Sequence, residues 1–289
     1  MKRFLLCIAI LLSCFSGFFS YAQGNSKTNR SLLWRISGKQ MSQPSYLFGT
    51  IHIICADDYI WTPAMQNSFD KTNELCLEMD MDDPNLPMDV AKGMINTSGK
   101  QLSEYFTPED YAVLEQYVKD TLGMGLSGFQ QIKPVGIFTI LTTKMASCPE
   151  PVSYEARLME LAHKNAREVT GLETAEEQLD LLDNLPADSI VKSIMQTIKG
   201  DTSQDESLTT LTNAYKQQDL AKLYELIKES KDIDLGGFLD TRNEKWIPRM
   251  IQKMDQRSVF FAVGAGHLWG EAGVIYLLRK EGYTVEPVK

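Results

Sequence analysis

Two stretches of the sequence with the same local pattern decide the fold: YLFGTIH at residues 46–52 and FFAVGAGH at residues 260–267. In each stretch a short apolar run, typical of a strand, is followed by Gly-x-x-His. Loops that follow the strands of an α/β sheet converge on one crevice, and a glycine at the turn lets the backbone approach closely. His52 and His267 are therefore predicted to face the same crevice as a pseudo-symmetric pair.

The segments around this pair predict an α/β (α+β) fold with a mixed central sheet built from N- and C-terminal strands. Apolar runs and alternation predict strands at 32–37, 45–48, 74–80, 167–172, 258–263 and 283–288. The pattern is helical from 84 to about 166, which predicts a large helical insertion, and helical again from 174 to about 254. The final strand, helix and strand are expected to form a right-handed βαβ unit.

The first 22 residues have the pattern of a signal peptide. Two basic residues precede an apolar run, and Ser20-Tyr21-Ala22 places small residues at the spacing that a signal peptidase recognises. We therefore expect residues 1–22 to be removed and residues 23–289 to form a single exported domain, periplasmic or secreted, without a membrane span. A lipid tether at Cys14 is the alternative, because residues 11–14 resemble a lipoprotein processing site.

Charge and cysteine content limit the classes of function. The chain carries a formal net charge of −9 and has no cluster of Lys and Arg beyond the signal peptide, which argues against a nucleic-acid partner. The three cysteines beyond the signal peptide, Cys55, Cys76 and Cys148, lack C-x-x-C spacing. At most one internal disulfide can form among them, and its pairing is left open.

The paired histidines suggest a metal site. Neutral imidazole is the commonest metal ligand in proteins, and two imidazoles with a carboxylate suit Zn, Mn, Co or Fe better than Ca or Mg. A catalytic ion would keep an open position for water. For either histidine alone, a hydrogen-bonded core residue at a strand end is an equally good interpretation; the duplicated setting is what favours function.

Four ordered segments together resemble the TraB/GumN family, which includes the Tiki metalloproteases of animals. They are YLFGTIH (46–52), LEMD (77–80), GLETAEEQ (171–178) and FAVGAGHL (261–268). The resemblance implies a peptidase-like, metal-dependent hydrolase in which His52, His267 and Glu78 hold a divalent ion, with Mn and Co as plausible as Zn, and a peptide or small molecule is the substrate. The chain departs from the family at Ile53-Ile54-Cys55, where a thiolate ligand from Cys55 would favour zinc.

Glu78 is the predicted ligand or general base, since a carboxylate beside a metal can orient and deprotonate its water. The alternative is a solvated carboxylate on an edge strand.

Glu173 and Arg242 are the other candidate catalytic residues. Glu173 matches the family's Leu-Glu-Thr signature, although favourable electrostatics at a helix start would also place an acid there. Arg242 belongs to a further family pattern with Asn243 and Trp246, and it is suited to stabilise an oxyanion or to hold a substrate carboxylate. A structural salt bridge from Arg242 to Asp240, Glu244 or Glu173 is the alternative.

The leading hypothesis is thus an exported, metal-dependent hydrolase. One alternative is an exported protein that binds a metal or haem at the same histidines without catalysis. Another is an interaction protein in which the motifs serve folding alone.

Overall fold

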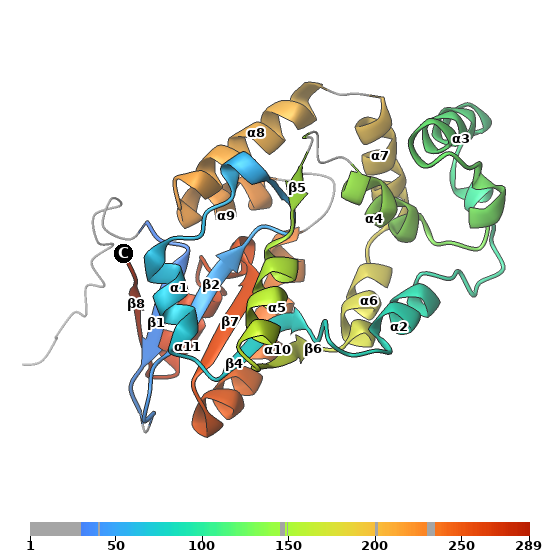
Figure 1. Cartoon of the computed structure of the whole chain (residues 1–289). Helices are drawn as coiled ribbons and strands as arrows, with labels where there is room; N and C mark the ends of the chain where they lie inside the picture. The colour runs from blue at the N-terminus through green and yellow to red at the C-terminus, as the bar shows by residue number, and fades with distance from the viewer. Residues whose placement is uncertain (1–29, 40, 145–147, 149, 200–201, 230–234) are drawn as a thin grey trace, which may run out of the picture.

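The computed structural model describes residues 30–289 except 40, 145–147, 149, 200–201 and 230–234. Its central sheet has the strand order β6-β4-β7-β2-β1-β8, and a second, two-stranded sheet pairs β3 with β5 (Figure 1). The strands are β1 (Leu33–Ser37), β2 (Ser45–Thr50), β3 (Ile54–Cys55), β4 (Glu74–Met79), β5 (Pro151–Val152), β6 (Glu168–Glu173), β7 (Val259–Gly264) and β8 (Thr284–Pro287).

The central sheet is mixed. Strand β4 pairs in parallel with β6 and with β7, and β7 pairs in parallel with β2, so four neighbouring strands end at the same edge of the sheet. Strand β1 is antiparallel to both β2 and β8. The predicted fold class is confirmed. The final strand, helix and strand do not join neighbouring strands, as the expected βαβ unit would. Strand β8 pairs with β1, so the connection from β7 to β8 passes over β2 and β1.

Helices cover both faces of the sheet. The helices are α1 (Pro63–Asp70), α2 (Leu86–Gly93), α3 (Pro108–Leu122), α4 (Pro134–Lys144), α5 (Tyr154–Lys164), α6 (Ala175–Asp183), α7 (Ala187–Ile198), α8 (Thr202–Lys216), α9 (Leu220–Lys228), α10 (Leu235–Gln256) and α11 (Val274–Lys280), with 3-10 turns at Ala56–Asp58, Leu102–Tyr105, Leu126–Phe129 and Ala265–His267. Helices α1 and α5 lie on one face, and α10 and α11 lie on the other (Figure 1). The capping box predicted at the start of α6 is present, with Thr174 as its N-cap.

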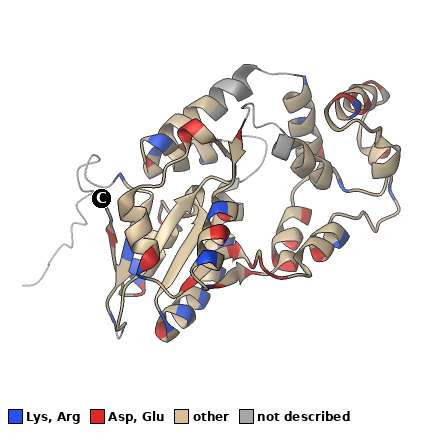
Figure 2. Cartoon of the chain, viewed as in Figure 1, with Lys and Arg blue, Asp and Glu red and all other residues tan. Residues whose placement is uncertain are grey.

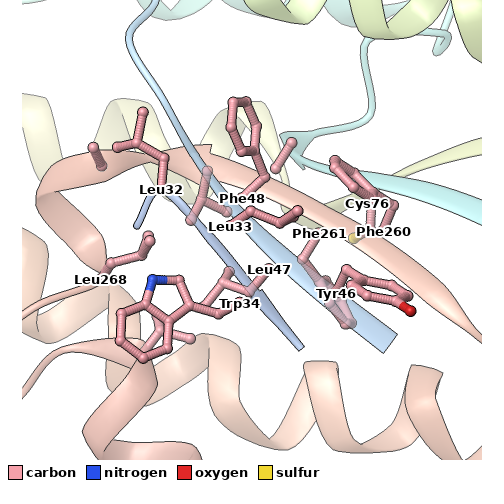
Figure 3. Packing of buried hydrophobic residues seen from close by; sticks show 14 of the residues in the cluster. Leu32, Leu33, Trp34, Tyr46, Leu47, Phe48, Cys76, Phe260, Phe261 and Leu268 are labelled. Atoms are coloured by element: carbon pink, nitrogen blue, oxygen red, sulfur yellow. The ribbon is translucent and has the colours of Figure 1, made fainter. Parts of the chain in front are cut away.

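The main core lies between the sheet and these helices. Phe48 and Phe260 come from the neighbouring strands β2 and β7, and their ring centroids are 6.1 Å apart (Figure 3). Tyr154 of α5 and Phe69 of α1 pack on these two rings from one face. Burying large aromatic side chains is strongly favourable, so these rings help to hold the two motif-bearing strands in the sheet.

The middle of the chain forms a second, separate hydrophobic core. It is built from residues of the predicted insertion, between Leu102 and Leu141, and from Ile190, Ile194 and Met195 of α7. The helical unit therefore extends beyond the predicted interval of 84–166, because α7 supplies an apolar face to it. Helix α5, inside that interval, instead packs on the main core through Tyr154.

A disulfide joins Cys55 of β3 to Cys148, with the two Cα atoms 5.8 Å apart, and Cys76 is a free, buried thiol. The predicted signal peptide, residues 1–22, and Cys14 lie outside the described residues. No helix within the described part of the chain combines the length and apolar character needed to cross a membrane.

Candidate active site at the carboxyl edge of the sheet

Four neighbouring parallel strands each deliver one candidate residue to the same edge. Glu173 is the last residue of β6, Glu78 is the penultimate residue of β4, His267 lies in the 3-10 turn after β7, and His52 follows β2 by two residues. These four residues come from distant parts of the sequence and meet at one edge of the sheet. The convergence predicted from the two Gly-x-x-His motifs is thus a consequence of the strand order β6-β4-β7-β2.

The two motif glycines allow close approach. A Cβ atom on Gly49 would lie 3.1 Å from the Cα of Ala265, so the first motif packs directly on the second. A Cβ atom on Gly264 would lie 3.3 Å from Oε1 of Glu78, and the Gly264 N–H donates to that same oxygen over 2.8 Å. Gly264 therefore gives room to the Glu78 carboxylate and also holds it.

Arg242 of α10 is the centre of the buried part of the site. Its Nε donates to both carboxylate oxygens of Glu173, at 3.1 and 3.2 Å, and its Nη2 donates to Glu173 and to Glu78. Its Nη1 lies 3.1 Å from Nε2 of His267. Arg242 is only 4% exposed, so these ion pairs are largely removed from water. Of the salt bridges predicted for Arg242, the one to Glu173 is present.

Glu173 is tied to the site and not only to a helix start. Besides Arg242, its carboxylate accepts from Nε1 of Trp246 at 2.9 Å and from Nε2 of Gln178 at 3.0 Å. The N-terminus of α6 is capped by the neighbouring Thr174. The carboxylate of Glu173 therefore serves to anchor α10, which carries both Arg242 and Trp246, against β6.

Glu78 lies on an interior strand, and its side chain is 12% exposed. The edge-strand alternative is therefore wrong: β4 is flanked by β6 and β7. Burial by itself would raise the pKa of Glu78, but the Arg242 guanidinium, with His267, His52 and the Gly264 N–H, holds that pKa well below its usual range. Glu78 is a fixed anion in this arrangement.

His267 is a buried neutral imidazole. Asn243 uses its Nδ2 to donate to two backbone carbonyls, so its Oδ1 is the acceptor for Nδ1–H of His267 at 2.7 Å. Nε2 of His267 then carries the lone pair. The imidazole also stacks on Trp246, with ring centroids 4.3 Å apart. Burial lowers the pKa of His267 to about 3.

His52 has the opposite environment. Its side chain is 68% exposed, and its Nδ1 lies 3.1 Å from Oε1 of Glu155, in the first turn of α5. The hydrogen bond to Glu155 raises the pKa of His52 to about 9. Within the described residues, no hydrogen bond joins His52 to Glu78 or to His267. The site therefore opens to solvent on the side of His52.

Sequence reasoning missed Glu155 and gave no role to Asn243. An acid in the first turn of a helix is ordinary, so nothing distinguished Glu155 from a residue that favours the helix N-terminus. Asn243 was recognised only as part of the family pattern with Arg242 and Trp246, without a role of its own. Its membership of that pattern was the available signal.

As arranged, the described residues contain no group of three His, Cys, Asp or Glu side chains close enough together to hold a metal ion. His267 Nε2 and Glu78 Oε1 are 3.7 Å apart, but the Arg242 guanidinium contacts both residues. The chemistry of the donor set nevertheless fits Mn, Co or Zn, because each histidine is held through Nδ1 and has Nε2 as its remaining ring nitrogen. Cys55 is excluded as a thiolate ligand by its disulfide.

A cavity of about 640 Å³ lies next to this site, between α2 and α6. Glu173 is the one residue of the candidate site that lines it, and the lining is strongly acidic. Figure 2 shows acidic residues in red along α2 and α6. The carboxylates are Asp80, Asp83, Asp89, Glu173, Glu176, Asp180 and Asp183. The cavity and the histidine-bearing surface are therefore neighbouring but distinct features.

The profile of the TraB/PrgY/gumN family matches residues 32–287. The chain belongs to this family. It is 24% identical to Metalloprotease TIKI2 of Danio rerio, over 91% of this chain and 62% of that protein, and 24% identical to Metalloprotease TIKI1 of Homo sapiens, over 89% and 61%. Metalloprotease TIKI2 of Xenopus tropicalis is 26% identical, over 89% and 59%. The chain thus spans about three fifths of the length of these relatives. No solved structure gives a significant match.

Proposed function

We propose that this protein is a metal-dependent hydrolase that cleaves peptide bonds, with His52, His267 and Glu78 as ligands of a divalent ion, Mn, Co or Zn. The observation that carries the proposal is the convergence of these three side chains at the ends of three adjacent parallel strands. The metalloprotease names of the relatives support the same class of reaction. A bound divalent ion would supply an activated water and polarise the scissile carbonyl.

The surrounding residues would prepare the ligands. Asn243 accepts a hydrogen bond from Nδ1 of His267, and Nδ1 of His52 lies within hydrogen-bond distance of Glu155. Glu78 is kept ionised by Arg242, which suits a ligand better than a general base, because a base works best with a pKa near the working pH. Arg242 would have to turn away from Nε2 of His267 when an ion binds, while Glu173 retains the guanidinium.

Export is part of this proposal. The pattern of residues 1–22 is that of a signal peptide, and the Cys55–Cys148 disulfide is of the kind that persists in oxidising compartments. The periplasm or the extracellular space is thus the proposed location.

A second candidate is an exported interaction protein without catalysis. The specific observation that favours it is the contact of the Arg242 guanidinium with both His267 and Glu78, which puts a positive charge of the protein itself between two of the ligands. In that case the motifs would serve the packing of the sheet edge.

Metal content separates the two candidates. Mature protein purified without chelator would be compared with His52→Ala, His267→Ala and, as a matched control, His163→Ala, since His163 pairs with Asp82 outside the site. About one ion per chain, lost in the first two folded variants and kept in the third, together with metal-dependent cleavage of a peptide library, is expected. A folded wild type without metal after reconstitution with Mn, Co and Zn would overturn the proposal.

A further inference from the structure

We propose that Glu155 is the positioning residue for His52, and that the Cys55–Cys148 disulfide with the β3–β5 pair clamps the His52 segment onto the segment that carries Glu155. The inference rests on the proposed function for its purpose but not for its geometry. It explains how the most exposed of the three proposed ligands is held in place.

Glu155 is itself fixed by three hydrogen bonds. Its Oε1 accepts from Oγ1 of Thr50 at 2.9 Å and from Nδ1 of His52 at 3.1 Å, and its Oε2 accepts from Oγ of Ser153 at 3.1 Å. Thr50 is 1% exposed at the end of β2, and the Glu155 side chain is 16% exposed. An ordinary surface ion pair has two mobile partners, whereas here the carboxylate is anchored in the wall of the sheet.

The helix that carries Glu155 is anchored as well. Tyr154, the preceding residue, is fully buried, and its hydroxyl accepts from the N–H of Ile60 and donates to the carbonyl of the same residue. The first turn of α5 is thus tied both to the core and to the segment that follows His52.

The other side of the clamp is the two-stranded sheet. Ile54 pairs with Val152 and Cys55 with Pro151, and Ala56 N–H donates to the carbonyl of Glu150 over 3.0 Å. The Cys55–Cys148 disulfide closes the same junction covalently. His52 stands two residues before this pair, and Glu155 stands three residues after it. The clamp therefore sets the distance between the histidine and its acceptor.

The arrangement has the chemistry of an outer partner of a metal ligand. A carboxylate that accepts from one ring nitrogen fixes the tautomer and the ring orientation, and leaves the other nitrogen for the ion. For His267, the amide oxygen of Asn243 accepts from Nδ1 in the same way. Because the His52 side chain is exposed and lacks the packing that holds His267, its order depends on the hydrogen bond to Glu155 and on the clamp that sets the distance between the two residues.

Ring dynamics on metal-free protein test the positioning directly. The chain has three histidines, so relaxation of each ring C–H is resolved by NMR after specific labelling. In the wild type we expect the His52 ring to be nearly as ordered as that of His267 and more ordered than that of His163. Glu155→Ala and the double change Cys55→Ala with Cys148→Ala should each lower the order of His52 towards that of His163. Glu155→Gln, which keeps an acceptor oxygen, should retain most of it.

Titration with Mn, Co and Zn is the second measurement. Loss of an outer partner weakens metal affinity by about 10–100-fold, so Glu155→Ala should fall in that range, with Glu155→Gln intermediate. Asp82→Ala removes the carboxylate from the other exposed histidine pair and should bind as the wild type does. Unchanged His52 order in Glu155→Ala would overturn the positioning proposal. If no metal binds to any form, the proposed function fails, while the ring order still decides the role of Glu155.

Discussion

The two Gly-x-x-His motifs are alike in sequence and opposite in environment. His267 is buried under Trp246, held by a neutral amide, and has its pKa lowered to about 3. His52 faces solvent, is held by a carboxylate, and has its pKa raised to about 9. The strands beneath them are adjacent and parallel, with Thr50 opposite Gly264.

The difference shows that the motif specifies a place in the fold and not an electrostatic state. Each glycine lets its strand end come close to a neighbour, and the histidine three residues later reaches the edge of the sheet. What then decides the charge of the imidazole is the element packed above it, which is α10 for His267 and α5 for His52.

The largest effect on the buried part of the site, around His267, is expected from Arg242→Met. Removing the guanidinium leaves Glu78 and Glu173 buried without their cation, so we expect the free energy of unfolding to fall by about 3–5 kcal/mol. Urea denaturation measures it. Arg157→Met, in an exposed pair with Glu160, is the control and should cost less than about 1 kcal/mol. Equal losses in both variants would show that the Arg242 cluster is not a buried network.

Comparing His267→Ala with His52→Ala sharpens the contrast between the motifs. His267→Ala removes a buried ring and leaves Asn243 without its partner, which should lower the free energy of unfolding by about 1–3 kcal/mol. At pH 9.5, where His52 is largely neutral and its charged pairing with Glu155 no longer contributes, His52→Ala should change it by no more than about 0.5 kcal/mol. Both should lose metal. A large loss of stability in His52→Ala would contradict the solvent-facing position of that residue.

The two motif glycines also differ in the expected cost of adding a methyl group. Gly49→Ala places a methyl group 3.1 Å from the backbone of Ala265, and such overpacking costs about 1–3 kcal/mol. In Gly264→Ala the new methyl group lies 3.3 Å from the end of the Glu78 side chain and 3.7 Å from the His267 ring, with no backbone atom as close, so we expect a stability loss below about 1 kcal/mol. Thermal or urea unfolding of the two variants is the check, and a reversed order would be inconsistent with the packing of the motifs.

The pH dependence of stability in metal-free protein should separate the two histidines by sign. The unfolded chain binds a proton at His267 below about pH 6.5, whereas the folded chain does not bind it until about pH 3. The contribution of His267 to the free energy of unfolding is therefore present above pH 6.5 and is lost as pH falls. Its slope is up to about 1.4 kcal/mol per pH unit. The contribution of His52 is present below about pH 6.5 and is lost as pH rises through 9.

Urea unfolding between pH 5 and 9.5 is the measurement. The difference between His267→Gln and wild type should vary on the acid side, and that between His52→Gln and wild type on the alkaline side. If the stability difference from wild type changed with pH in the same direction for both variants, the two histidines would share one electrostatic environment.

Local patterns in the sequence were sufficient to predict the strands that carry the site. Apolar runs and alternation predicted the strands that became β1, β2, β4, β6, β7 and β8, and the structure confirms them with ends shifted by one or two residues. Hydrophobic period and strand-end glycines report burial of the neighbouring residues, so they also placed His52 and His267 just after strands and Glu78 on one face of the 74–80 strand. The family resemblance supplied Glu78, Glu173 and Arg242 as site residues.

Other features were beyond the sequence because they depend on pairing over long separations. Glu155 is 103 positions from His52, and Arg242 is 164 positions from Glu78. The Cys55–Cys148 pairing was open among three cysteines until the β3–β5 pair brought the two together.

The sequence alone thus determined that the two motif histidines follow strands at the carboxyl edge of the sheet, since that follows from the residues next to each of them. Only the tertiary structure decided the order β6-β4-β7-β2, the guanidinium between Glu78 and Glu173, and the opposite charges of the two histidines. The physical reason is that a side chain's charge depends on the groups that surround it in space, and those are supplied by elements far away along the chain.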